Sequence, residues 1–148
     1  MATVELRFSA QPEHVRTARL VAAAVARRAG VDEAVLDEVR LAVGEACSRA
    51  VGLHRSHGID APVRVVLTEE EKLFSIEVGD EVPGSGGGAS AVPGVRGPSP
   101  DDELDDGAED EMGLAVISGL VDDVEVTSGE SGGVIRMSWP TTPATLLP

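Results

Sequence analysis

Hydrophobic residues recur along the first third of the chain at two periods, which predict two kinds of element. In residues 3–9 apolar and polar positions alternate, as in a half-buried strand. In residues 12–29 and again in residues 32–54, apolar positions return every three or four residues, as on one face of a helix. Gly30 suits the position after the first helix, and Asp32 can cap the second. The expected buried stripe of the second helix consists of Leu36, Val39, Val43, Cys47, Ala50 and His54.

The alternating pattern returns later in the chain, interrupted by one long irregular segment. Residues 63–67 and 74–78 alternate on either side of a charged turn at residues 69–72, which predicts a hairpin. Residues 83–107 are rich in Gly, Pro, Ser and Asp. A loop of this length in a compact domain is usually a lid, a binding segment or disordered. Apolar spacing then predicts a short helix at residues 114–121.

The last apolar alternation completes a fold-class prediction. Residues 124–126 and 135–139 indicate two strands joined by a turn at residues 128–133, and residues 141–148 are expected to be a loose tail. This order of elements predicts an α+β fold, a two-layer sandwich with helices on one face of a mixed, mostly antiparallel sheet. We expect residues 1–140 to form a single domain.

Composition narrows the class of function. The 148 residues include 42% hydrophobic but only 2% aromatic ones, so a single core of Val, Leu, Ala and Ile is expected. The formal net charge of −14 argues against direct nucleic-acid binding, which needs an excess of Lys and Arg. No apolar run approaches the length of a membrane span, and the N-terminus has no signal-peptide pattern. These features predict a soluble cytoplasmic protein.

Cysteine and histidine offer little metal chemistry. The single cysteine, Cys47, cannot form an internal disulfide and is expected to be a small core residue. His54 and His57 have the spacing of a metal pair, but zinc usually needs three or four protein ligands and no third one is evident. We therefore expect no metal site and interpret the pair as the end of a helix.

Glu45 and Arg49 lie four residues apart in the second predicted helix. They can pair on the helix surface, which would stabilise it by roughly 0.2–0.5 kcal/mol. A glutamate such as Glu45 can act as a general base, although most glutamates are solvated surface residues. The Arg49 guanidinium cannot ligate Mg²⁺, which requires oxygen donors, but its planar fork suits phosphate oxygens.

The segment around this pair, residues 41–48 (LAVGEACS), resembles the start of the first nucleotide-binding box of the GHKL ATPases, and specifically of the anti-sigma-factor serine kinases. Residues 8–10 (FSA) resemble the N-terminal signature of that family, and residues 76–84 (IEVGDEVPG) resemble its second box. Residues 113–117 (GLAVI) stand where the third box falls. The resemblance covers residues 3–139 and implies the GHKL (Bergerat) fold, in which nucleotide lies between helices and sheet under a mobile lid.

The resemblance implies roles for individual residues of the first two boxes. Glu45 would be the general base that orients the attacking serine hydroxyl of a protein substrate. Arg49 takes the place of an asparagine that helps to hold Mg²⁺. Asp80 stands where the family accepts a hydrogen bond from the adenine amino group, although the end of a strand explains this residue almost as well. Gly84 would let the backbone approach the base.

The resemblance also implies roles for residues of the third box and of the first helix. Gly113 keeps one glycine of the third box, whereas Ala115 replaces the second, where a Cβ could crowd phosphate. The simpler interpretation of Ala115, which we favour, is the start of a helix. Arg19 matches an arginine that contacts both the sigma factor and the phosphorylatable antagonist, and Arg16 lies one turn earlier. Exposed arginines on helices are also commonplace.

Three features predict weakened binding of phosphate: Arg49, Ala115 and the acidic run of residues 101–111. The eight carboxylates of that run would repel ATP, and the predicted lid contains no basic residue other than Arg96. We therefore predict an anti-sigma-factor-like regulatory protein that binds a STAS-type anti-sigma-factor antagonist, a sigma factor or both. Impaired ATP binding and kinase activity are expected, so no cofactor is expected. The acidic run has two open interpretations, a solvated segment or a contact for a basic partner.

Two alternatives stay open. The first is an active ATP-dependent serine kinase that phosphorylates its anti-sigma-factor antagonist, which would require ATP and Mg²⁺. The second is a sensor that binds adenine nucleotide without turnover. Family resemblance also makes a homodimer plausible.

Overall fold

A computed structural model describes residues 2–83, 115–121 and 123–141 of the chain. Predictions for residues 84–114, which include most of the predicted lid and the acidic run, lie outside the described residues, as does the predicted tail except for its first residue. In chain order, the elements are β1 (Ala2–Phe8), α1 (Pro12–Ala29), the 3₁₀ turn η1 (Glu33–Val35), α2 (Leu36–Ser56), β2 (Val63–Glu70), β3 (Leu73–Gly79), a helical segment at residues 115–120, β4 (Asp123–Gly129) and β5 (Gly132–Pro140).

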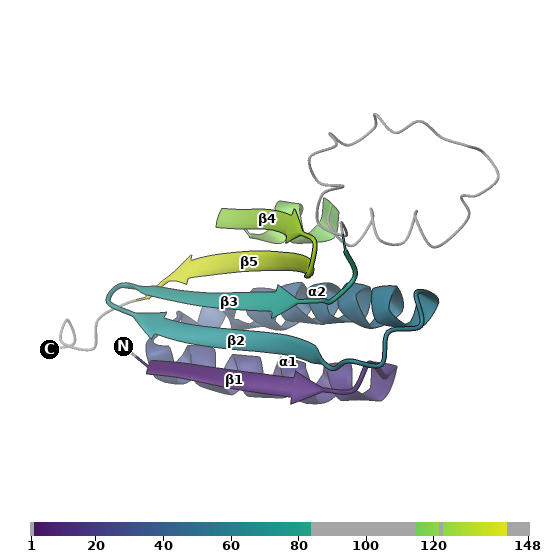
Figure 1. Cartoon of the computed structure of the whole chain (residues 1–148). Helices are drawn as coiled ribbons and strands as arrows, with labels where there is room; N and C mark the ends of the chain where they lie inside the picture. Colours follow the sequence, from purple (N-terminus) through teal and green to yellow (C-terminus); the bar gives the residue numbers. More distant parts are fainter. Residues whose placement is uncertain (1, 84–114, 122, 142–148) are drawn as a thin grey trace, which may run out of the picture.

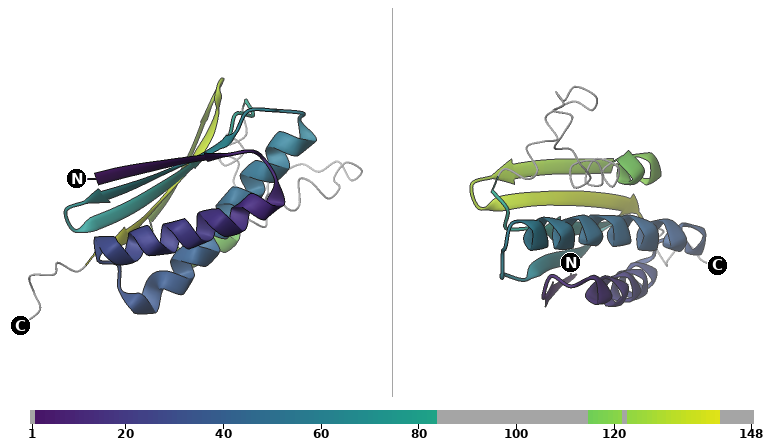
Figure 2. Two further views of the ribbon diagram at one scale, coloured as in Figure 1. Left: turned by 90° about the horizontal axis from the view of Figure 1, so that it is seen from below. Right: turned by 90° about the vertical axis from the view of Figure 1, so that its right-hand side faces the viewer.

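The strands form one five-stranded sheet in the order β1-β2-β3-β5-β4. Both long helices lie on the same face of this sheet (Figure 1), and Figure 2 shows the helices and the sheet as two layers. The predicted α+β two-layer sandwich is therefore confirmed. Every pairing between the described strands is antiparallel, so the parallel component of the expected mixed sheet is not found among them.

The core lies between the two layers because strand side chains alternate between the faces of the sheet. Leu67, Ile76 and Met137 are opposite one another in the three central strands, and all three are fully or almost fully buried. The predicted apolar stripe of α2 faces them, and all six of its residues are buried. Because β1 is an edge strand, its inward residues are only half-buried.

The two hairpin turns are tighter than the sequence pattern predicts. Glu70 is paired with Leu73, so the turn expected at residues 69–72 shrinks to two residues. Gly129 is paired with Gly132, and the turn expected at residues 128–133 shrinks likewise. Both predictions were wrong at their boundaries because backbone pairing continues to the turn regardless of whether the side chains alternate in polarity.

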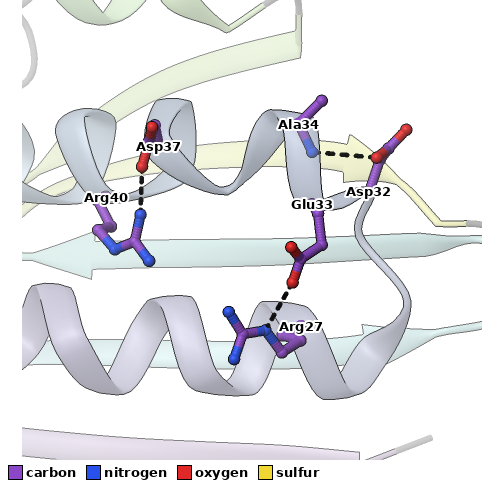
Figure 3. Close-up of polar contacts among 6 residues, drawn as sticks. All are labelled: Arg27, Asp32, Glu33, Ala34, Asp37 and Arg40. Atoms are coloured by element: carbon purple, nitrogen blue, oxygen red, sulfur yellow. Dashed lines mark hydrogen bonds and ion pairs between the residues drawn. The ribbon is translucent and has the colours of Figure 1, made fainter.

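The connection between the two helices is held by side chains close to the turn (Figure 3). Gly30 follows α1 with a φ of 104°, in the left-handed conformation that glycine adopts readily. Asp32 accepts a hydrogen bond from the Ala34 amide at 3.0 Å, so it caps the short 3₁₀ turn rather than α2 itself. Arg27 reaches back to Glu33 at 3.2 Å. These contacts lie in the short connection that reverses the chain between α1 and α2.

Candidate functional site

The middle of α2 presents Glu45 and Arg49 toward different environments. Glu45 is half-buried, whereas Arg49 is only 8% exposed and belongs to the packed side of the helix. The expected surface pair is therefore not formed: within the part of the chain that the structure describes, no ion pair joins these two side chains. The Arg49 side chain is thus buried one turn after the candidate base, and it is not without an interaction partner.

Asp80 directly follows β3 and is locked into place by the neighbouring hairpin. It continues the alternation that points Ile76 and Val78 toward the helices, and it is 7% exposed. One carboxylate oxygen, Oδ1, accepts backbone hydrogen bonds from Val82 at 2.8 Å and from Gly133 at 3.3 Å. The Asp80 amide in turn donates to the Gly133 carbonyl at 3.0 Å. Asp80 is therefore a structured residue and not merely the loose beginning of a loop.

The glycine before Gly133 makes this close approach possible. A Cβ built on Gly132 would lie 1.9 Å from the Asp80 carbonyl oxygen, and Gly132 has a φ of 139°. Only glycine tolerates both the contact and the conformation. The sequence pattern predicted a turn here but did not reveal that this turn supports Asp80.

His54 joins the end of α2 to two other segments and is completely buried. Its Nε2 accepts a hydrogen bond from the Glu81 amide at 2.8 Å, so this nitrogen carries no proton. Its Nδ1 lies 2.9 Å from the Ala61 carbonyl oxygen and must then donate. The tautomer of His54 with its proton on Nδ1 makes both hydrogen bonds. His54 therefore ties α2 to the loop before β2 and to the segment after Asp80.

Sequence reasoning missed this role of His54, although it placed the residue on the apolar face of its helix. A polar residue within an apolar stripe was the available signal, because buried polar groups are nearly always hydrogen-bonded. Backbone groups occupy both ring nitrogens of His54. Within the described residues, no group of three or more His, Cys, Asp or Glu side chains could hold a metal ion.

Cys47 is a core residue, as predicted. It is a free thiol with no exposed surface, and burial raises its pKa to about 12. A buried protonated thiol is a poor nucleophile.

Arg16 and Arg19 lie on α1, and both are exposed as predicted. Arg19 reaches across to α2: its Cδ would lie 2.7 Å from a Cβ built on Gly44. The candidate partner-binding arginine and the candidate base Glu45 are thus on adjacent helices. Arg49 follows Glu45 by one turn of α2, and Asp80 follows the end of β3.

The third box is only partly described. Ala115 is exposed and lies in the helical segment at residues 115–120. Gly84 and Gly113 lie outside the described residues, so their roles stay predictions. Ile117 in this segment and Val121 directly after it are buried in the core, as the apolar spacing predicted. None of the helices that the structure describes is long and apolar enough to cross a membrane.

Comparison with known proteins identifies the family to which this chain belongs. Residues 8–139 match the model of the histidine kinase-like ATPase domain. The serine-protein kinase RsbW of Bacillus pumilus is 30% identical over 141 residues, which cover 91% of this chain and 83% of that protein. RsbW of Oceanobacillus iheyensis is 27% identical over 136 residues, which cover 91% and 84% of the two chains.

A solved structure shares the fold. The RsbU and RsbW domains of Rv1364c from Mycobacterium tuberculosis align with a TM-score of 0.64 over 97% of this chain, at 15% sequence identity. This chain spans about a third (34%) of that longer chain. At this identity the likeness concerns the fold alone.

Proposed function

Because this chain belongs to the histidine kinase-like ATPase family, in its group of anti-sigma-factor serine kinases, we propose that it is a regulatory protein that acts mainly by binding. Its proposed partners are a STAS-type anti-sigma-factor antagonist, a sigma factor or both, through which it would control bacterial transcription. Mg-ATP binding and serine phosphorylation are proposed to be impaired.

The observation that supports impairment most directly is the buried Arg49, one turn after Glu45. In the family that residues 41–48 resemble, the residue at this position supplies a carboxamide to Mg²⁺. A guanidinium has no lone pair to donate to a cation, and its positive charge would repel one. Phosphoryl transfer depends on a metal that bridges the terminal phosphates and neutralises their charge. Glu45 could still orient a hydroxyl, but the charge stabilisation would be missing.

A titration with Mg-ATP in a calorimeter tests impairment, together with phosphate transfer from labelled ATP to purified STAS-domain proteins of the source organism. We expect weak or undetectable heat and no robust labelling. Micromolar binding followed by transfer to a serine would instead establish the active kinase. In that case Glu45→Ala should abolish transfer while leaving partner affinity unchanged.

A nucleotide sensor without kinase activity would give a third combination of results with the same proteins. ATP would then raise the melting temperature, because a ligand that binds only the folded state stabilises it by RT ln(1 + [L]/Kd). The serine of the antagonist would stay unmodified.

The partner surface is proposed to include Arg16 and Arg19. Both side chains are exposed on α1, in a chain whose formal net charge is −14, so this helix is a local positive region. An arginine fork pairs well with carboxylates of a partner. Arg19→Ala should weaken capture of a purified STAS-domain antagonist or sigma factor with little change in melting temperature. Unchanged affinity would remove Arg19 from the interface.

A further inference from the structure

Arg19 does not extend freely into solvent, because its side chain lies against the backbone of α2. A Cβ added to Gly44 would lie 2.7 Å from Cδ of Arg19, 3.4 Å from its Cγ and 3.6 Å from its Nη1. The aliphatic stem and one guanidinium nitrogen therefore follow the surface of α2 at this glycine. Gly44 itself is buried.

Glycine is a poor choice for the interior of a helix, since it loses more backbone entropy on folding than alanine does. The neighbouring core positions Ala42 and Ala46 show that small residues other than glycine occur in this part of α2. At position 44 even a methyl group would force Arg19 aside. Glycine at this position therefore lowers the stability of the helix, but it leaves room for the exposed Arg19 side chain to lie against α2.

We propose that Gly44 is a positioning residue that holds Arg19 across the junction of α1 and α2, ready to receive a carboxylate of a partner protein. This inference rests on the proposed partner-binding function of Arg19. A long side chain that must be ordered on binding loses rotamer entropy, whereas one already held in place loses less. Gly44 would therefore raise partner affinity without touching the partner.

Gly52, two turns later on α2, provides a matched control. It also lies in the interior of this helix, and a Cβ added there meets no atom within 4 Å. Gly44→Ala and Gly52→Ala should both strengthen the helix, so both variants are expected to melt at or above the wild-type temperature. Only Gly44→Ala displaces Arg19. A gain in stability accompanied by a loss of binding is a combination that a merely structural role would not produce.

The expected result in a titration with purified STAS-domain antagonist is a loss of affinity of about tenfold for Gly44→Ala and no loss for Gly52→Ala. The double variant with Arg19→Ala should bind no more weakly than Arg19→Ala alone, because both changes remove the same contact. If Gly44→Ala binds like the wild type while Arg19→Ala weakens binding, the positioning role is refuted and the partner surface stands. If Arg19→Ala has no effect, the partner surface itself is refuted.

A measurement without any partner covers the case in which Gly44→Ala folds poorly. Nuclear magnetic relaxation at the Nε of Arg19 in the wild-type protein reports whether this side chain is held. We expect Arg19 to be more ordered than Arg16, which is also exposed and lies one turn earlier. Equal mobility of the two arginines would overturn the proposal.

Discussion

Replacing His54 by leucine tests the connection between α2 and the Asp80 segment. Leucine is similar in size and apolar, so it keeps most of the packing of this fully buried side chain but can make neither hydrogen bond. The Glu81 amide and the Ala61 carbonyl would both lose their partner. Because these backbone groups belong to segments at the surface, water can partly replace the lost bonds.

The magnitude follows from two bonds of ordinary net strength. Each contributes about 1 kcal/mol to the free energy of unfolding, so the variant should lose about 2 kcal/mol. For a domain of this size a loss of 1 kcal/mol lowers the melting temperature by about 3 °C, and the expected decrease is therefore about 6 °C. His54→Asn should lose about half as much in hydrogen bonding, since its amide can still donate to Ala61.

Differential scanning calorimetry measures the decrease, and amide hydrogen exchange at Glu81 shows whether the second bond existed. His57→Leu is the matched control: His57 directly follows α2 and is exposed, and among the described residues its ring bonds the Leu53 carbonyl at 3.0 Å. Its effect should stay within about 0.5 kcal/mol. If His54→Leu melts like the wild type and its Glu81 amide is equally protected, the reasoning about His54 is refuted.

Three further predictions concern individual residues. Arg49→Asn supplies an oxygen donor and should tighten Mg-ATP binding by at least about tenfold in calorimetry; unchanged binding would mean that Arg49 is not the cause of impairment. Cys47 should resist thiol reagents at pH 8 in the folded protein and react in urea, because burial raises its pKa to about 12; its contribution to stability should decrease as the pH rises above its ordinary pKa of 9.0. Gly132→Ala should lower the free energy of unfolding by about 3 kcal/mol or prevent folding, because its Cβ would meet the Asp80 carbonyl, whereas Gly129→Ala, with open space, should be nearly neutral in urea denaturation.

The sequence predicted the elements well because each depends on local periodicity. The apolar stripe of α2 is one example: a run such as Val39, Val43 and Cys47 can bury itself on one side only if the backbone is helical. Boundaries were less predictable. The turn at residues 69–72 carries four charged residues, yet Glu69 and Glu70 are in β2, because backbone hydrogen bonds rather than side-chain polarity determine where pairing ends.

For the candidate site, too, the sequence predicted some features and only the packing of the fold decided others. Glu45 and Arg49 could be found from their spacing and from the surrounding motif, and the match to the family covers both residues. Whether Arg49 is a surface residue could not be read from spacing, because the side of a helix that becomes buried depends on what packs against it. Arg49 is 8% exposed, so it is not the surface partner of Glu45 that the spacing allowed.

By itself, the amino-acid sequence determined the order of strands and helices, the α+β class and the family, since periodicity and motif spacing are properties of neighbouring residues. Tertiary structure alone decided that His54 holds the Glu81 amide, that Gly132 makes room for Asp80, and that Gly44 supports Arg19. Each of these contacts joins residues 25 or more positions apart. Only the packing of sheet and helices brings such residues within a few ångströms, so no local pattern could reveal them.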